Sequence, residues 1–171
     1  MTEPVTIEDY DPRWPEQFEI IRGRVAAVLG DMAAAIEHVG STSVPGLAAK
    51  PILDIDVLLA ASADVRGTIA ALATLGYEHR GDLGIAGREA FRGPVGNFRH
   101  HLYVCPSDSA EYARHIAFRD YLRSHPEDAR EYVRLKRRLA ERFGTDREGY
   151  NLAKTEFVRE VLRRAQDELR S

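Results

Sequence analysis

The sequence has few lysines, few cysteines and little net charge. Of its 24 basic residues only three are lysines, Lys50, Lys136 and Lys154, and the 27 acidic residues leave a formal net charge of −3. This balance excludes a protein that binds nucleic acid or a membrane surface by bulk positive charge. The single cysteine, Cys105, excludes an intramolecular disulfide framework and a zinc site of clustered cysteines, and it fits a reducing compartment.

Long apolar runs and targeting signals are also missing. No apolar stretch approaches the ~20 residues that a membrane-spanning helix needs, and the longest, Pro51 to Ala61, carries two aspartates. The first residues, Met1 to Pro4, lack the basic and then apolar run of a secretory signal peptide. With 171 residues, 44% of them hydrophobic and 30% charged, the chain has the composition of one globular domain, which we expect in the cytoplasm.

The pattern along the chain changes near residue 106. Before it, short β-like runs alternate with helical ones, and after it the pattern is helical to the end. We expect one α+β domain over residues 1–171, with a small mixed β-sheet flanked by helices in a catalytic-type core (1–106) and a helical extension (107–171). The expected helices and strands of the core are helices over 14–29 and 65–75 and strands over 36–39, 51–59, 77–80, 89–92 and 98–105.

Start signals mark the C-terminal helices. Three pairs have the spacing of a capping box: Asp108 with Glu111, Ser124 with Glu127, and Thr145 with Glu148. An apolar stripe is expected on the helix after the second pair, at Tyr132, Leu135, Leu139 and Phe143. We expect the arginines of that helix, and Lys136, on an ordinary charged face in solvent.

The strand 51–59 carries the clearest candidate for chemistry. Side chains alternate across a strand, so Asp54 and Asp56 share one face, together with Ile52 and Leu58. Two neighbouring carboxylates repel unless something compensates them, and Mg²⁺ is commonly held by one or two carboxylates and substrate phosphates. The alternative is a solvent-facing edge strand whose aspartates keep it soluble. The apolar residues on the same face favour the metal site.

A glycine- and hydroxyl-rich turn, Gly40 to Ser43, precedes this strand. Open backbone N–H groups, small side chains and a helix start are the ingredients of a phosphate cradle, and Gly40, Ser41, Thr42 and Ser43 are the candidates to form it. The turn is not a Walker A loop, because no Gly-Lys-Ser/Thr follows at the right spacing. Lys50 is either a further phosphate contact or a surface lysine before a proline.

Gly40-Ser41 followed by Asp54-Ile55-Asp56 resembles the signature of the polymerase-β-like nucleotidyltransferase superfamily. More closely, the chain resembles the GrpB family, a branch of that superfamily. The resemblance covers nearly the whole chain through the stretches YDPRWP at 10–15, HVGSTSVPGL at 38–47, KPILDI at 50–55, RHHL at 99–102 and FRDYL at 118–122, and through Tyr150, Lys154 and Phe157-Val158.

The resemblance implies a nucleotidyltransferase-like fold and a two-metal mechanism. Two Mg²⁺ ions would bridge Asp54 and Asp56 to a nucleoside triphosphate, one activating the attacking hydroxyl and the other stabilising the leaving pyrophosphate. Gly40 and Ser41 would hold the triphosphate. Active members usually add a third carboxylate from a neighbouring strand, but its expected place, residues 97–105, contains no Asp or Glu.

Other candidates have a structural alternative. His101 shares a strand face with Tyr103 and Cys105. Four interpretations are open for it: a metal ligand, a general base, a phosphate contact or a structural residue. His38 lies at the rim of the site or bonds to the backbone. Arg88, Arg92 and Arg99 clamp phosphate or lie on a solvated hairpin. Tyr150 and Lys154, one helical turn apart, would reach the cleft together, with Lys154 on phosphate.

Two functions follow from these patterns. The first is a Mg²⁺-dependent nucleotidyltransferase that transfers a nucleoside monophosphate from a nucleoside triphosphate to an unidentified small-molecule or protein acceptor. The second is a non-catalytic nucleotide- or metabolite-binding accessory domain on a degenerate fold of the same kind, motivated by the missing third carboxylate. A carboxylate from Glu78, Asp82 or Glu89 that reaches the two aspartates would favour the first. A nucleic-acid polymerase is not expected, nor is a membrane partner, and the sequence leaves the oligomeric state open.

Overall fold

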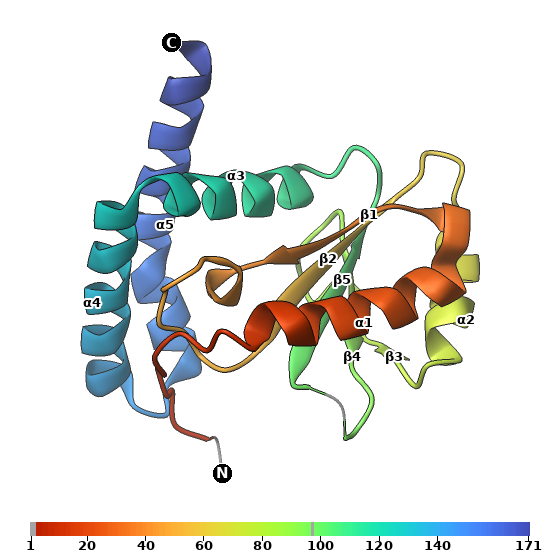
Figure 1. Ribbon diagram of the computed structural model, residues 1–171, viewed down its shortest axis with the longest axis horizontal. Coiled ribbons are helices and arrows are strands. Elements are labelled where there is room, and N and C mark those ends of the chain that lie inside the picture. The colour runs from red at the N-terminus through yellow and green to blue at the C-terminus, as the bar shows by residue number, and fades with distance from the viewer. Residues whose placement is uncertain (1–2, 97) are drawn as a thin grey trace.

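The computed structural model describes residues 3–96 and 98–171, and its centre is a mixed five-stranded sheet (Figure 1). The strand order is β1-β2-β5-β4-β3. The strands are β1 (Ala33–Val39), β2 (Leu53–Leu59), β3 (Glu78–His79), β4 (Glu89–Arg92) and β5 (His100–Cys105). The β2–β5 pair is parallel and the other pairs are antiparallel. The strand that carries the two aspartates, β2, therefore lies inside the sheet.

Helices α1 (Trp14–Leu29) and α2 (Val65–Ala73) cover one face of the sheet. The helix α1 begins at the expected prolines and ends at Gly30, as predicted. Its buried side chains recur every three or four residues, so they form one stripe. This stripe packs in one apolar cluster with the inward side chains of β2, which are Leu53, Ile55, Val57 and Leu59. The opposite face of β2 is left for the aspartates.

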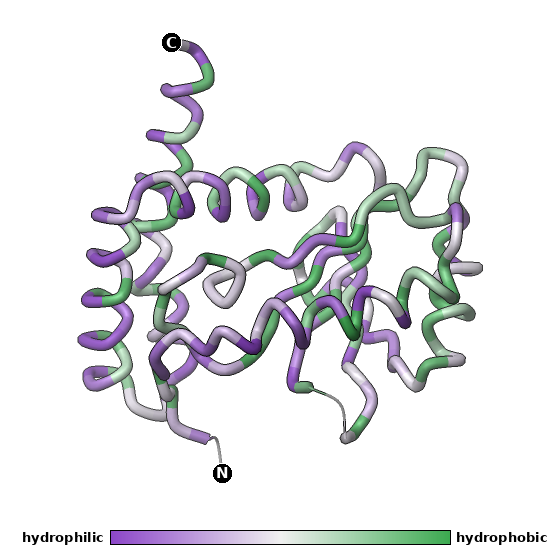
Figure 2. The backbone as a smooth tube through the Cα atoms, viewed as in Figure 1, coloured by the Kyte–Doolittle hydropathy of each residue, from purple (hydrophilic) through white to green (hydrophobic). Residues whose placement is uncertain are grey.

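The C-terminal part is helical, as the pattern predicts. Helices α3 (Ala110–Ser124), α4 (Pro126–Phe143) and α5 (Arg147–Arg170) pack on one another beside the sheet, with α4 and α5 side by side (Figure 1). Figure 2 shows hydrophilic residues along much of α4. Val44 and Leu47, from the turn after β1, pack into the cluster formed by α3 and α5. The predicted phosphate turn is therefore anchored in the helical part.

The predicted helix starts are close but the capping residues are wrong. Ser109 and Asp146 cap α3 and α5 by accepting hydrogen bonds from Tyr112 N and Gly149 N, each one residue later than predicted. No side chain caps α4. Ser124 belongs to the last turn of α3, and its hydroxyl donates back to the carbonyl four residues earlier.

A smaller difference concerns the first strand. Strand β1 begins three residues before the predicted 36, because Ala33 and Ala35 also pair with β2, across an irregularity. The turn after β1 contains a short 3₁₀ helix, η2 (Ser41–Ser43).

Among the helices formed by residues 3–96 and 98–171, none has the length and apolar character needed to cross a bilayer.

Candidate active site

Asp54 and Asp56 lie on the face of β2 turned away from α1 and α2. The Asp56 side chain is fully buried, whereas 35% of the Asp54 side chain is exposed. Both lie between neighbouring strands, with His101 and Tyr103 of β5 opposite them on one side and β1 on the other. The alternative of a solvent-facing edge strand is therefore wrong. The structure shows a carboxylate pair at the centre of the sheet.

His115 of α3 joins the buried carboxylate to a third acidic residue. Its Nδ1 donates to Asp56 Oδ2 at 2.6 Å and its Nε2 lies 3.0 Å from Glu111 Oε1. Ionised carboxylates only accept, so a carboxylate near each ring nitrogen favours the doubly protonated, positively charged ring. Burial disfavours this charge, but the hydrogen bond to Asp56 and the negative charges of Asp56 and Glu111 outweigh burial and raise the pKa of His115.

These two helix residues were missed by the sequence reasoning. We predicted only a capping role for Glu111 and none for His115. Their i,i+4 spacing places them on one face of α3, and this spacing is the sequence signal from which an interacting pair could have been predicted. The sequence has no signal that this face meets Asp56, because that contact depends on how α3 packs on the sheet.

The carboxylate pair fits a divalent cation. Asp56 Oδ1 is buried and has no hydrogen-bond partner among residues 3–96 and 98–171. Burial raises the pKa of the Asp56 carboxyl, and the bond from His115 offsets part of that rise. A bare buried carboxylate oxygen is costly, and a cation held by Asp54 and Asp56 would remove the cost.

The donor set from the protein is small. Within the described part of the chain, no group of three or more His, Cys, Asp or Glu residues is arranged to hold a metal ion. Mg²⁺ often takes only one or two carboxylates from the protein and completes its shell with water and substrate phosphates. The two aspartates are therefore compatible with Mg²⁺ bound together with a phosphorylated substrate.

Gly40 packs directly against Asp54. Its φ of +72° lies in the region that favours glycine, and a Cβ at this position would collide with the Asp54 carboxylate. The turn that follows is held from two sides. Ser43 Oγ donates to the Gly40 carbonyl at 2.5 Å, and Arg123 of α3 donates twice to the Ser43 carbonyl. The turn is thus pressed rigidly against the first aspartate.

His38 lies beneath this turn in the core. It is buried, stacks on Phe18 with ring centroids 5.0 Å apart, and its Nε2 lies 2.8 Å from Thr42 Oγ1. Burial lowers the pKa of His38 to about 4, so the ring is neutral near pH 7. His38 therefore supports the turn from the core through its contact with the Thr42 hydroxyl.

All three lysines of the chain line one cavity beside Asp54. This lysine cavity has a volume of about 240 Å³, and Ser41, Thr42, His101 and Tyr150 also line it. The Nζ atoms of Lys50 and Lys154 lie 4.3 and 4.5 Å from the centre of the Tyr150 ring. Among the lining residues that the structure describes, Asp54 is the one acid. The cavity therefore has an excess of positive charge.

Lys136 corrects the sequence-based expectation. It does not lie on a charged face in solvent but is 2% exposed, and its ammonium donates to the Ala48 carbonyl and lies 4.6 Å from the centre of the Tyr132 ring. Burial and the charges of the other lysines lower the pKa of Lys136 to about 7 and that of Lys154 to about 8. Neither ammonium forms an ion pair within residues 3–96 and 98–171, and the negative charge of Asp54 offsets only part of the lowering of the Lys154 pKa.

His101 stands between Asp54 and solvent. Its Nδ1 lies 3.1 Å from Asp54 Oδ1, and 53% of its side chain is exposed. Since the carboxylate accepts, Nδ1 carries the proton, and Nε2 has no hydrogen-bond partner within residues 3–96 and 98–171. In its neutral form the ring would present a lone pair on Nε2, while Asp54 fixes its orientation.

The three candidate arginines lie outside the lysine cavity. Arg99 pairs with Glu3 at 3.1 Å and lines two other cavities that His101 also lines. The Arg88 guanidinium lies 4.3 Å from the centre of the Tyr103 ring. Arg92 lines one of the cavities shared with Arg99.

None of the three candidate carboxylates replaces the missing one. Glu78 pairs with Arg80, Glu89 with His79, and Asp82 accepts from the backbone N–H of Gly84. The first position of the expected region, Asn97, lies outside the described residues. The acidic residue that does approach Asp56 is Glu111, and it does so through His115.

The fold is nucleotidyltransferase-like, and it carries a carboxylate pair on an inner strand, a Gly-Ser turn against the first carboxylate, and helices beside the sheet. The Cid1 poly(U) polymerase bound to MgGTP shares the fold with a TM-score of 0.54 at 14% identity, over 80% of this chain and 45% of that one. Within this class the chain belongs to the GrpB family, whose model, described as GrpB protein, matches residues 4–164.

Two further relatives agree with this assignment. A crystal structure of the conserved protein GrpB from Enterococcus faecalis superposes with a TM-score of 0.86 at 33% identity, over 97% of this chain and all of that one. A UPF0157 protein of Pseudomonas aeruginosa is 43% identical over 159 residues, which cover 91% of this chain and 65% of the relative.

Proposed function

We propose that this protein is a Mg²⁺-dependent nucleotidyltransferase that moves a nucleoside monophosphate from a nucleoside triphosphate to a small-molecule or protein acceptor. The observation that carries the proposal is the convergence of Lys50, Lys136 and Lys154 in one cavity beside Asp54. A triphosphate and a carboxylate pair repel each other unless cations lie between and around them. Three lysines and a divalent cation on the aspartates would supply those cations.

The lysine cavity suits the phosphates of the substrate. Besides burial, the charges of Lys154 and Lys50 lower the pKa of Lys136, and the charge of Lys50 lowers that of Lys154; a bound polyanion would replace this repulsion by attraction. Lysine binds phosphate well as a point charge. Ser41 lines the same cavity and would add a neutral donor next to the lysines.

Asp54 and Asp56 would hold the metal. When bound, Mg²⁺ polarises the reacting phosphate and stabilises the charge of the leaving pyrophosphate. His115 holds Asp56 through Oδ2, which fixes the carboxylate and leaves Oδ1 as the open ligand atom. Because Gly40 has no side chain, the space that a Cβ would occupy is left for the Asp54 carboxylate.

We assign to His101 the role of taking the proton of the acceptor. An acceptor hydroxyl would give its proton to Nε2 of His101 as its oxygen forms a bond to the α-phosphorus. The bond from the α-phosphorus to the oxygen that bridges to the β-phosphate breaks, and pyrophosphate leaves with that oxygen. Asp54, bonded to Nδ1, stabilises the charged ring, and the exposed ring then releases the proton to solvent.

One observation favours the second candidate function, a nucleotide- or metabolite-binding domain without catalysis. Along β5, Tyr103 stands opposite Asp56, so in the described residues no third carboxylate comes from that strand. In this alternative His115 would compensate Asp56 permanently, and the lysine cavity would still bind nucleotide. The two functions therefore differ in turnover and not in binding.

Pyrophosphate release separates them. The protein would be incubated with each of the four nucleoside triphosphates, Mg²⁺ and a panel of hydroxyl- and phosphate-bearing acceptors, none of them nucleic acid. Turnover that disappears in Asp54→Asn and Asp56→Asn is the expected result. Nucleotide binding without pyrophosphate release across the panel favours the accessory domain, and release that persists in both variants contradicts the assigned site.

A further inference from the structure

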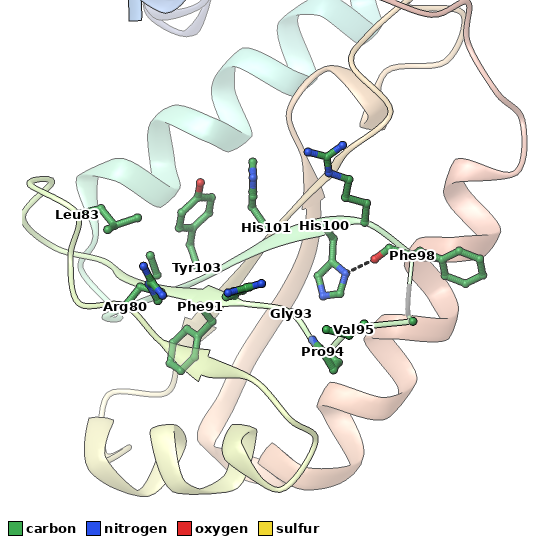
Figure 3. A pocket seen from close by; sticks show the side chains of 14 residues that line it. Arg80, Leu83, Phe91, Gly93, Pro94, Val95, Phe98, His100, His101 and Tyr103 are labelled. Atoms are coloured by element: carbon green, nitrogen blue, oxygen red, sulfur yellow. Dashed lines mark hydrogen bonds between the residues drawn. The ribbon is translucent and has the colours of Figure 1, made fainter. Parts of the chain in front are cut away.

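A second cavity, of about 570 Å³, shares His101 with the lysine cavity. We call it the arginine cavity, because its lining includes Arg80, Arg92 and Arg99 and, among the described residues, no Asp or Glu. Figure 3 shows His101 and Tyr103 on its wall, pointing to the same side of β5. Within residues 3–96 and 98–171, His101 is the one side chain that lines both cavities, so molecules bound in the two would meet there.

The wall of the arginine cavity is built rigidly around His100. Its Nδ1 lies 2.5 Å from the Phe98 carbonyl and its Nε2 2.7 Å from the Tyr77 hydroxyl. Gly93 packs so closely on this ring that a Cβ there would lie 2.9 Å from it. Both ends of the connection between β4 and β5 are therefore held, as the dashed bond in Figure 3 illustrates for Phe98.

The charges of the cavity are open to a ligand. Arg92 stands opposite His101 in the β4–β5 register, which places both on one sheet face, and it has no ion-pair partner within residues 3–96 and 98–171. Arg80 and Arg99 do have partners, but their pairs with Glu78 and Glu3 are exposed. Exposed ion pairs are weak and are exchanged readily for a stronger anion.

Apolar surface lies beside these charges. Leu83 is 61% exposed and Phe98 39%, and the Tyr103 ring lies on the same wall. Apolar and aromatic side chains grouped around a cavity are typical of small-molecule sites. The lining therefore combines a cationic group with an aromatic and aliphatic wall, which suits an organic anion with an apolar portion.

We propose that the arginine cavity is the acceptor site, and that the acceptor is a small organic molecule with a phosphate or carboxylate head and an apolar or aromatic body. Arg92 binds the anionic head, Phe98 and Leu83 cover the body, and the reacting hydroxyl lies at His101. This assignment rests on the proposed transferase function, since it is that function which needs two substrates to meet at one side chain.

Phenyl phosphate is a suitable probe, because it joins an aromatic ring to a dianion. Its binding would be followed by NMR titration of the protein, with inorganic phosphate and phenol as the two half-probes. We expect Arg92→Ala to weaken binding by about tenfold or more, as the loss of a charged hydrogen-bonding partner implies. Arg134→Ala, an exposed arginine on α4, is the matched control and should bind as the unchanged protein does. Inorganic phosphate alone should bind more weakly than phenyl phosphate.

The same titration distinguishes the two cavities. Lys154→Met should leave phenyl phosphate affinity within about twofold, and ATP should bind together with the probe and not displace it. The inference is overturned if Arg92→Ala binds normally, if Lys154→Met abolishes binding, or if ATP competes with the probe. Phenyl phosphate binding that depends on Arg92 in a protein that fails to bind nucleotide would support the site and refute the proposed transferase instead.

Discussion

Replacing Lys154 with methionine removes a charge from the lysine cavity but keeps most of the side chain's bulk. Burial, and after it the charge of Lys50, lowers the pKa of Lys154 from its ordinary 10.5 to about 8. That gap corresponds to about 3 kcal/mol of unfavourable free energy for keeping the ammonium charged in the folded protein at pH 7. Solvent and local relaxation reduce the penalty, so we expect Lys154→Met to stabilise the protein by about 1–3 kcal/mol.

The pH dependence of this gain follows from the direction of the shift. A lysine whose pKa is lowered in the folded state destabilises the protein fully below that folded pKa, and the penalty vanishes above the unfolded pKa. The stabilisation by Lys154→Met should therefore be present at pH 7 and largely absent near pH 10.5. Urea unfolding at the two pH values measures it, and a rise in Tm of roughly 2–4 °C per kcal/mol should accompany it.

The same variant should lose function while it gains stability. Removal of one lysine from a phosphate site costs about 1.5–3 kcal/mol of binding, so nucleoside triphosphate affinity should fall about tenfold or more. Arg159→Met, on the exposed side of the same helix, is the control and should change neither quantity appreciably. A Lys154→Met protein that is less stable at pH 7, or that binds nucleotide normally, would refute the reasoning, because Lys154 would then be a structural residue.

Three further variants test the supports of the site. Gly40→Ala should lower the free energy of unfolding in urea by about 2 kcal/mol or more, because it adds a collision with Asp54 to the strain of a positive φ. Gly46→Ala, at φ +80° with open space around the new Cβ, should lower it by only about 1 kcal/mol. Equal losses in the two variants would contradict the close approach of Gly40 to Asp54. Burial lowers the pKa of His38 from its ordinary 6.5 to about 4 in the folded protein, so folding becomes less favourable by about 3 kcal/mol as the pH falls from 6.5 to 4. His38→Gln should remove this loss of stability in acid. An unchanged slope of stability against pH would refute that. His115→Ala should destabilise the protein by about 3 kcal/mol at pH 7, because it leaves Asp56 buried without its countercharge, and an unaltered denaturation midpoint would exclude the bridge.

Local sequence patterns were enough to predict most of the framework. Alternation along β2 placed both aspartates on one face, opposite the inward side chains Leu53, Ile55, Val57 and Leu59. The prolines and Gly30 set the limits of α1. These features depend on residues near one another in the sequence, where backbone geometry and side-chain alternation decide the outcome.

The parts that could not be predicted depend on packing between distant elements. His115 reaches Asp56 because α3 packs against the sheet near β1, and no local pattern encodes that packing. Lys136 was assigned to solvent because its helix is rich in charge, yet it follows Tyr132 by four residues and precedes Leu139 by three, which places all three on one buried face. The helical period contained that signal, and the residue type concealed it.

The coupling between Mg²⁺ and nucleotide binding tests the central claim most directly. Isothermal titration of each nucleoside triphosphate, with and without Mg²⁺, would be compared between the unchanged protein and Asp56→Asn. We predict that Mg²⁺ raises the affinity of the unchanged protein about tenfold or more, and that Asp56→Asn retains the metal-free binding of the lysine cavity but loses the effect of Mg²⁺. No nucleotide binding at all, or the same Mg²⁺ effect in Asp56→Asn, would contradict the account.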